Sequence, residues 1–306
     1  MNKPIRIGTR DSALALWQAK TVQSQLQALG YETALVPIKS QGDINLDTPL
    51  YELGITGIFT KTLDLALLRK EIDIAVHSMK DVPTALPKGI VQAAVMKRAT
   101  ATDILATKST FNPNDVCTIA TGSLRRKAQW LAQYPHHTVV DLRGNVNTRL
   151  QKLQDNNWAG AIFAQAGLER IDILPQSYET LDWMIPAPAQ GAMMIATLQE
   201  NTYAFDACAK LNDTPSQLCT QIERDFLRTL EGGCTAPIGA LAQIENNQLH
   251  VKACLFSLDG SQKIEVSKTI IMNQSKDFGV KCAVEVLDNG GRELMKEIKT
   301  GINKKE

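Results

Sequence analysis

Residues 5–38 read IRIGTRDSALALWQAKTVQSQLQALGYETALVPI. A short apolar strand pattern at 5–7 is followed by a helical apolar period from Ala13 to Leu29, which Gly30 ends, and by a second strand pattern at 34–38. Two strands joined by a helix lie parallel in one sheet. This stretch therefore predicts a doubly wound α/β fold with a mostly parallel sheet.

The same alternation of strands and helices continues along the chain, and it restarts after the Ala- and Thr-rich stretch at 98–103. Two α/β domains of similar construction are therefore expected, although no internal sequence repeat is present. The expected elements are a helix at 60–69 and strands at 72–76, 90–95 and 192–196 in the first domain, then strands at 117–120, 138–141 and 159–163 with helices at 123–133 and 146–153 in the second.

The pattern changes from Pro215, where a long amphipathic helix runs to Leu230. Three strand patterns and a C-terminal helix follow, which indicates a small α+β third domain. Two prolines in 185–191 mark a turn or hinge before it. The later elements are strands at 238–244, 249–257 and 264–272 and a helix at 275–299. Three domains are therefore expected: a discontinuous first domain at 1–97 and 192–213, a second at 98–191 and a third at 214–306.

Composition describes a globular chain of 306 residues, of which 44% are hydrophobic and 21% charged. Lys plus Arg number 33 against 32 Asp plus Glu, so no overall charge favours nucleic acid or an anionic membrane. The start of the chain lacks a signal-peptide pattern, and every apolar run is too short for a bilayer span. We expect a cytoplasmic protein without a membrane or nucleic-acid partner.

The cysteines and histidines do not predict a metal site or disulfides. The six cysteines form no CxxC pair, and the four histidines lack ligand spacing. Thiols in the cytoplasm are also normally reduced.

Basic residues concentrate locally between Thr121 and Arg170, with seven Lys and Arg against three acidic residues. Arg125, Arg126 and Arg143 follow predicted strand ends, where doubly wound sheets bind ligands. Guanidinium groups and helix N-termini both favour anions, so this pattern predicts a site for a ligand with several negative groups. The alternative is a solvated face with scattered ion pairs. No Walker or GxGxxG string supports a nucleotide.

Six segments of the chain are much more specific than its composition. They occur in order from about residue 5 to residue 240, and together they resemble the porphobilinogen deaminase (hydroxymethylbilane synthase) family. The segments are IGTRDSALALWQ (7–18), DIAVHSMKDVPT (73–84), GSLRR (122–126), LRGNVNTR (142–149), PAQGA (188–192) and LEGGCTAPIG (230–239).

The resemblance implies three domains, two of which are similar to periplasmic binding proteins with a cleft between them. It also implies a dipyrromethane cofactor, attached through a thioether to Cys234 of the third domain. The implied activity is a transferase reaction of tetrapyrrole biosynthesis, in which four porphobilinogens are joined head to tail with loss of ammonia and hydroxymethylbilane is released by hydrolysis. The only implied partner is the substrate, and the protein is expected to be a monomer.

The site residues are carried over from the matching motifs. Asp81 is expected to be catalytic: it would hydrogen-bond pyrrole N–H groups, stabilise developing positive charge and assist proton transfer. Without the resemblance, a lone Asp after a strand is more simply a helix cap. Expected cofactor-binding residues are Cys234, Ser78, Lys80, Thr121, Ser123, Arg125, Arg126, Arg143, Gly144 and Arg149; expected substrate-binding residues are Arg10, Ser12, Gln18, Arg143, Arg149, Arg170 and Gln190.

The chain departs from the family pattern at four positions. Many relatives carry a lysine where this chain has Thr56, and a basic residue can occur at Glu52; Gly122 replaces a frequent serine and Ala196 a frequent glutamate. None of these is an expected catalytic position, so activity is still expected. Two other functions stay open at this point: a non-catalytic protein that binds small polycarboxylates, and a nucleic-acid-binding module that uses the basic middle domain.

Overall fold

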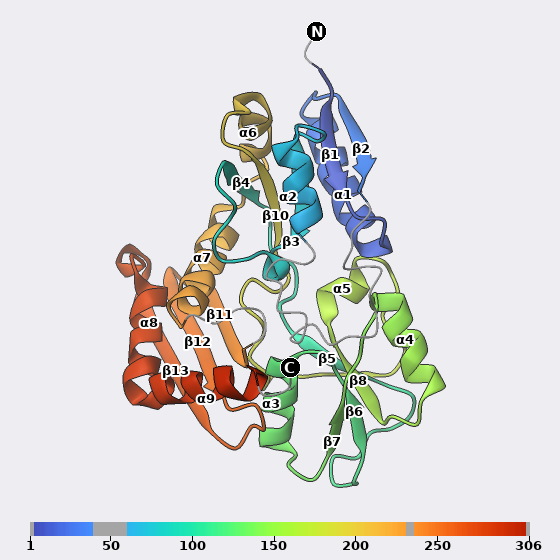
Figure 1. Ribbon diagram of the computed structural model, residues 1–306, viewed down its shortest axis with the longest axis vertical. Helices are drawn as coiled ribbons and strands as arrows, with labels where there is room; N and C mark the ends of the chain where they lie inside the picture. The colour runs from blue at the N-terminus through green and yellow to red at the C-terminus, as the bar shows by residue number, and fades with distance from the viewer. Residues whose placement is uncertain (1–2, 39–59, 231–235, 304–306) are drawn as a thin grey trace. The chain divides into compact units, whose positions relative to one another are not determined.

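The computed structural model describes residues 3–38, 60–230 and 236–303, which form two compact units (Figure 1). Of these residues, unit 1 contains 3–38, 60–99 and 191–218, and unit 2 contains 100–190, 219–230 and 236–303. The α/β class with a small α+β C-terminal part is confirmed. The three-domain division is finer than these two units and stays a prediction.

Unit 1 is built on a five-stranded sheet in the order β2-β1-β3-β10-β4. The strands β2, β1 and β3 are parallel, and β10 is antiparallel to both of its neighbours, so four of the five strands share one direction. The elements are β1 (Ile5–Thr9), α1 (Ala13–Ala28), β2 (Thr33–Pro37), α2 (Lys61–Leu68), β3 (Ile74–Ser78), the 3-10 turn η2 (Met79–Asp81), β4 (Ile90–Val95), β10 (Met193–Leu198) and α6 (Thr202–Ala209).

Unit 2 contains a second five-stranded sheet with the equivalent order, β7-β6-β8-β5-β9. Here β5 is the strand that runs against the other four. The elements are β5 (Asp103–Thr107), β6 (Thr118–Ala120), α3 (Leu124–Gln133), β7 (Thr138–Val140), α4 (Val146–Asp155), β8 (Gly160–Ala164), α5 (Gln165–Glu169) and β9 (Tyr178–Thr180).

The reversed strand of each sheet is the first strand that the chain forms after it passes from one unit to the other. The chain passes at 99–100 before β5 and at 190–191 before β10. A reversed strand begins at the edge where its neighbours end, so Asp103 pairs with Ala164 at the carboxyl end of β8. This topology places the start of β5 at the ligand-binding edge of the sheet.

The rest of unit 2 contains an antiparallel sheet in the order β11-β12-β13, with helices from the same part of the chain. The single helix expected at 275–299 is wrong: Gly290 has a φ of 98°, and the helix is interrupted there. The elements are β11 (Ile238–Glu245), β12 (Gln248–Phe256), β13 (Lys263–Ile271), the 3-10 turn η3 (Met272–Gln274), α8 (Phe278–Val286), the irregular turn η4 (Leu287–Gly291) and α9 (Arg292–Asn303); α7 (Thr214–Thr229) begins in unit 1 and continues into unit 2.

Apolar packing joins this second sheet to α3. Ala128 of α3 forms a buried cluster with Cys254 and Phe256 of β12. Gly260 lies so close to the Ala128 carbonyl that a side chain at 260 would overlap it. The position of α3, which carries two of the expected arginines at its start, is therefore fixed by β12 and the turn that follows it.

Candidate functional site

In unit 1, the expected residues follow the carboxyl ends of two adjacent parallel strands. Arg10 and Ser12 follow β1, and the segment from Ser78 to Asp81 ends β3 and forms η2. Ser12 also begins α1, where its side chain accepts a hydrogen bond from Ala15 N at 3.4 Å. The sheet topology thus brings both segments to one edge.

Gln18 and Ser78, which come from different motifs, contact each other directly. The buried Gln18 side chain donates a hydrogen bond from Nε2 to Ser78 Oγ at 2.8 Å. This bond fixes the position of the serine hydroxyl beside η2. The structure therefore shows Gln18 supporting Ser78 and leaves a direct contact of Gln18 with substrate as a prediction.

Asp81 lies in a short, well-anchored turn. Met79 and Val82 on either side are buried, and Met79 N donates to Ala192 O at 3.0 Å while Val82 N donates to Met79 O at 3.2 Å. Lys80 and Asp81 are half-buried. A carboxylate on such a rigid turn is suited to act on a ligand without large reorganisation.

His77, one residue before this segment, is buried in β3. Burial lowers its pKa to about 4, and the positive charge of Arg10 acts in the same direction. The imidazole is therefore neutral near pH 7, which agrees with a structural role.

In unit 2, three segments meet at the carboxyl edge of the first sheet, after β6, β7 and β8. The first two begin helices: Ser123 accepts from Arg126 N at 3.4 Å, and Asn145 accepts from Thr148 N at 2.9 Å. Gly144 has a φ of 113°, which side-chain-bearing residues rarely adopt. The local backbone therefore requires glycine at this expected cofactor-binding position.

Gly122 has a packing reason of its own. A Cβ atom at this position would lie 2.5 Å from the carbonyl oxygen of Leu142, the residue before Arg143. The buried Thr121 next to it donates its N–H to Val140 O at 2.9 Å. The segments after β6 and β7 are thus in close backbone contact, and the departure at Gly122 fits this contact.

Arg125 and Arg126 are buried and share one carboxylate, that of Asp103. Arg126 donates to Asp103 Oδ1 from Nε at 3.1 Å and from Nη2 at 2.8 Å, and from Nη1 to Ile162 O at 3.0 Å. Arg125 Nη2 lies 2.8 Å from Asp103 Oδ2, and its Nη1 donates to Ile185 O at 2.8 Å. Burial lowers the pKa of Arg125, while Asp103 opposes that shift.

Gln190 contributes to the same cluster. Its side chain is 1% exposed, and Nε2 donates to Ala101 O at 2.6 Å and to Asp103 Oδ1 at 2.8 Å. The expected contact between Gln190 and substrate stays a prediction, because the structure shows the amide bonded within the protein.

The other three arginines lie after β7 and β8. Arg143 is buried, and its Nε has no hydrogen-bond partner among the described residues. Burial lowers the pKa of Arg143 and of Arg170, while Asp141 and Glu169 respectively oppose these shifts. Arg149, on α4, is half-buried. A buried guanidinium nitrogen without a partner fits a site that receives an acidic group.

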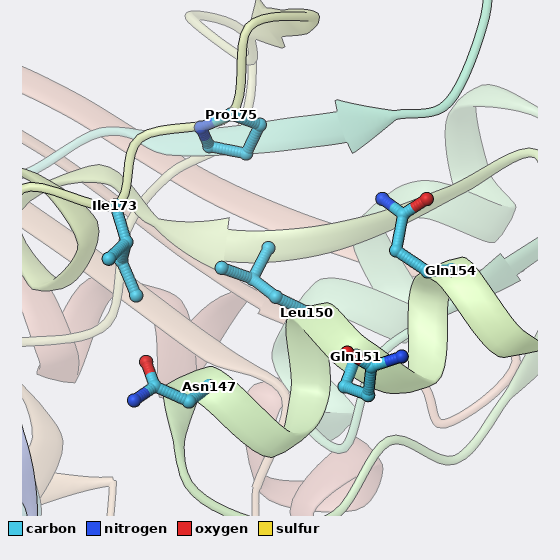
Figure 2. Close-up of a pocket in the computed structure, with 6 residues that line it drawn as sticks. All are labelled: Asn147, Leu150, Gln151, Gln154, Ile173 and Pro175. Atoms are coloured by element: carbon cyan, nitrogen blue, oxygen red, sulfur yellow. The ribbon is translucent and has the colours of Figure 1, made fainter.

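A surface groove of about 300 Å³ lies beside α4 (Figure 2). Its lining contains no charged side chain, so it does not suit a polycarboxylate. The lining residues are Asn147, Leu150, Gln151, Gln154, Ile173 and Pro175.

Three expected positions, Cys234, Glu52 and Thr56, lie outside the described residues. Among the described residues, Cys208, Cys219, Cys254 and Cys282 are buried, and Cys117 is half-buried. Burial raises the pKa of Cys208 and Cys254 to about 12 and that of Cys282 to about 11.

Within the described residues 3–38, 60–230 and 236–303, no three His, Cys, Asp or Glu side chains are grouped to hold a metal ion. No helix in these ranges has the length and apolarity to cross a membrane.

Two buried carboxylates were missed by the reasoning from sequence. One is Asp103, and the other is Glu223 of α7, whose oxygens accept from Ala189 N at 2.6 Å and Ala242 N at 2.7 Å. The partners of each carboxylate are distant from it in the chain. Neither Asp103 nor Glu223 itself lies in one of the recognised motifs. The one available signal was an isolated Asp at the start of the apolar run 104–106.

Family models match most of the chain. The model described as "Porphobilinogen deaminase, dipyromethane cofactor binding domain" matches residues 5–206, and the model described as "Porphobilinogen deaminase, C-terminal domain" matches residues 217–288.

Curated relatives match over almost their full length. The chain is 40% identical over 304 residues to the porphobilinogen deaminase of Campylobacter hominis, with 97% of this chain and 98% of that protein covered. It is 42% identical over 301 residues to the porphobilinogen deaminase of a Nitratiruptor species, with 95% and 96% covered.

Solved structures show a more distant similarity. The periplasmic VFT2 domain of Bordetella pertussis BvgS has a TM-score of 0.41 at 12% identity, with 67% of this chain and 86% of that chain covered. An ancestral cationic amino acid solute binding protein has a TM-score of 0.42 at 13% identity, with 68% and 87% covered.

Proposed function

The chain belongs to the porphobilinogen deaminase family, and from that membership we propose how its residues carry out the family's reaction. It is a hydroxymethylbilane synthase of tetrapyrrole biosynthesis: four porphobilinogens are condensed stepwise, head to tail, with loss of ammonia, and the product is released by hydrolysis. The assignment of individual residues to this reaction is our proposal.

The observation that carries the proposal is the excess of buried guanidinium groups at the carboxyl edge of the first sheet of unit 2. Each pyrrole ring of the substrate and of the cofactor carries an acetate and a propionate group. Arg125 and Arg143 each have a buried Nε without a hydrogen-bond partner among the described residues, so their donors fit additional carboxylates. Arginine suits this role because its charge is permanent and its planar fork can bind a carboxylate through two bonds.

The cofactor is dipyrromethane, and when bound it supplies the primer to which the substrate is joined. We propose Cys234 as its attachment point, through a thioether, because it is the cysteine of the matching motif. The residues that we propose to hold its carboxylates and pyrroles are Ser78, Lys80, Thr121, Ser123, Arg125, Arg126, Arg143, Gly144 and Arg149.

Asp81 is the proposed catalytic residue. Loss of ammonia from the substrate's aminomethyl group leaves a cation whose charge extends to the ring nitrogen. A carboxylate held on the anchored turn η2 can accept hydrogen bonds from pyrrole N–H groups, stabilise that charge and take part in proton transfers. The supporting feature is the placement of Asp81 between two buried side chains, which limits its movement.

We propose that Arg10, Ser12 and Arg170 hold the incoming porphobilinogen. Arg10 and Ser12 follow β1, and Arg170 lies at the end of α5, with Gln18 acting through its hydrogen bond to Ser78. The transferase class, a cytoplasmic location and a monomeric state complete the proposal, and they are motivated by the family's chemistry.

The decisive experiment compares the intact mass of the wild-type protein with that of Cys234→Ala. The wild type should carry an excess equal to two porphobilinogens less two ammonias, and the variant should lack it. Cys117→Ala, which removes a half-buried cysteine from another part of the chain, is the matched control and should keep the excess.

The second experiment measures ammonia release and porphobilinogen consumption by wild type, Asp81→Ala and Asp81→Asn. Both variants should lose at least about a hundredfold in turnover if Asp81 stabilises charge and handles protons. Near-normal turnover in Asp81→Ala would contradict the proposed mechanism. Reversible binding of porphobilinogen by the wild type without ammonia release would instead indicate a polycarboxylate-binding protein.

A further inference from the structure

We propose that Asp103 is a positioning residue for the reaction: its buried carboxylate orients Arg125 and Arg126 and links them to Gln190. This inference rests on the proposed function, because it concerns the two arginines assigned to the cofactor. It assigns a role to a residue that lies outside all six recognised motifs.

The Asp103 carboxylate is contacted by two other parts of unit 2, the start of α3 and Gln190. The carboxylate is fully buried at the start of β5. Its Oδ1 accepts hydrogen bonds from Arg126 Nε, Arg126 Nη2 and Gln190 Nε2, at 3.1, 2.8 and 2.8 Å, and its Oδ2 lies 2.8 Å from Arg125 Nη2. Two consecutive residues at the start of α3 are therefore oriented by one acidic group.

The charges in this cluster do not balance. Asp103 is the only carboxylate that forms an ion pair with Arg125 or Arg126 among the described residues, so two buried positive charges face one negative charge. A buried surplus charge is strongly unfavourable unless another group compensates it. The surplus thus favours a further anion, and the unused Arg125 Nε offers a donor for it.

Asp103 is essential to this arrangement because it holds two like-charged side chains next to each other. Without the carboxylate, repulsion would drive the guanidinium groups apart and change the direction of their remaining donors. The remaining anchors of the two arginines are backbone carbonyls, those of Ile185 for Arg125 and Ile162 for Arg126. Carbonyl oxygens cannot replace the lost negative charge.

Gln190 connects the cluster to two linker segments. Its Nε2 also donates to Ala101 O at 2.6 Å, and Ala101 lies in the segment before β5. Gln190 itself ends the segment 185–190, just before the chain passes to unit 1. Any change in the direction of the arginines is therefore coupled to the backbone of both linkers through Asp103.

The chain contains a suitable comparison in unit 1. Arg6 donates from Nε to Asp73 Oδ2 and from Nη2 to Asp73 Oδ1, both at 2.9 Å. Unlike the Asp103 cluster, this ion pair contains one arginine for one carboxylate. Both side chains are also partly exposed, at 41% and 22%. This pair has balanced charges and no expected contact with ligand. Removing its carboxylate tests the general effect of losing an ion pair on stability.

The test compares wild type, Asp103→Ala and Asp73→Ala, each with and without sodium formate, and with sodium chloride at equal ionic strength as the salt control. Asp103→Ala leaves a space between two guanidinium groups that formate can fill. We expect its KM for porphobilinogen to rise at least about tenfold, with kcat per cofactor-loaded molecule changing less than about threefold. Formate, unlike chloride, should restore KM toward the wild-type value and raise the thermal unfolding midpoint.

Asp73→Ala should show a lower thermal midpoint but an unchanged KM and no specific response to formate. A KM for Asp103→Ala equal to that of Asp73→Ala, or a formate effect no larger than that of chloride, would overturn the proposal. If Asp103→Ala does not fold, Asp103→Asn keeps the side-chain volume and should show the same rise in KM. A higher KM for Asp103→Asn supports the proposal, and a wild-type KM overturns it.

The two proposals fail in distinguishable ways. A wild-type protein without ammonia release would contradict the proposed function. The formate-dependent change in the thermal midpoint of Asp103→Ala does not depend on turnover, so it tests the charge relationship by itself.

Discussion

Burial determines the protonation state of His77, the histidine next to the proposed catalytic segment. Its pKa is lowered from 6.5 to about 4, chiefly by burial and secondly by Arg10. Because the folded pKa lies below the unfolded value, the stability contributed by the neutral ring is fully present above pH 6.5. It is lost as the pH falls toward 4, and the total loss is on the order of 3 kcal/mol.

The expected result is that the free energy of unfolding of the wild type falls more steeply between pH 6.5 and 4 than that of His77→Gln. Urea unfolding at several pH values across this window measures the difference. Equal slopes for wild type and His77→Gln would show that His77 does not titrate in this range.

The cysteines should differ sharply in their reactivity. Burial raises the pKa of Cys208 and Cys254 to about 12, so almost no thiolate forms near neutral pH. Iodoacetamide should therefore modify the half-buried Cys117 first among the described cysteines and leave Cys208 and Cys254 unmodified. Peptide mapping after brief alkylation of the native protein measures this order.

Cys234 adds a second outcome to the same experiment. In protein that carries the cofactor, the proposed thioether blocks this sulfur, so no carboxamidomethyl group should be found there. A Cys234 adduct in protein whose intact mass shows full cofactor occupancy would contradict the proposed attachment. Modification of Cys254 before Cys117 would contradict the order derived from burial.

Individual site residues were predictable from sequence only where they lie in contiguous motifs. The positions of Asp81 and Arg143 after strands follow from local patterns, and the structure confirms that each follows a strand. Asp103 could not be found in this way, because its partner Gln190 is 87 residues away. The inward direction of the Gln190 amide was likewise undetectable, because a motif gives a residue's position but not the contacts of its side chain.

At the scale of secondary structure, elements with a strong apolar periodicity were predicted well. Short elements without such a pattern were predicted poorly. The helices expected at 123–133 and 146–153 correspond to α3 and α4, and the strand expected at 90–95 has those bounds. The strands β5 and β9 were missed because both depend on antiparallel pairing with segments distant in sequence. Local propensity contains no information about such partners.

A substitution at Gly122 tests how closely the segments after β6 and β7 must approach. In Gly122→Ala, the new Cβ would lie 2.5 Å from Leu142 O, so the backbone before Arg143 must shift. We expect a loss of about 1–3 kcal/mol in the free energy of unfolding, together with a higher KM for porphobilinogen. Urea unfolding and steady-state kinetics measure the two effects.

Gly301→Ala is the matched control for this substitution. A Cβ at Gly301 would meet only the end of the Leu258 side chain, at 3.0 Å, and alanine is favoured over glycine within a helix such as α9. This variant should have wild-type KM and equal or greater stability. If Gly122→Ala behaved like Gly301→Ala, the close contact with Leu142 would not constrain the site.

At the scale of the whole molecule, the same strand order is formed twice by segments without a sequence repeat. In each unit, three parallel strands are followed in the sheet by a reversed strand and an edge strand. The alternation of strands and helices predicted two α/β domains, but it did not predict the reversed strands. Their direction is set by where the chain enters each sheet from the other unit, which is a property of the complete topology.

The linkers at 98–102 and 186–190 should respond to substrate as the molecule changes conformation. Their backbone is tied by specific bonds: Ala99 N donates to Gly191 O at 3.1 Å, and Ala189 N donates to Glu223 Oε2 at 2.6 Å. If the units move about these segments during the reaction, these bonds must break or strengthen, and amide exchange must change with them.

Hydrogen exchange followed by mass spectrometry, with and without porphobilinogen, measures this response in the cofactor-loaded protein. Peptides that cover both linkers should change their exchange rate by at least about threefold, equivalent to about 0.7 kcal/mol in the opening free energy. The buried strand β12, paired on both sides, provides the internal control and should not change. Unchanged exchange in both linkers while substrate is consumed would exclude them as hinges, and the conformational change would then have to be sought in other segments.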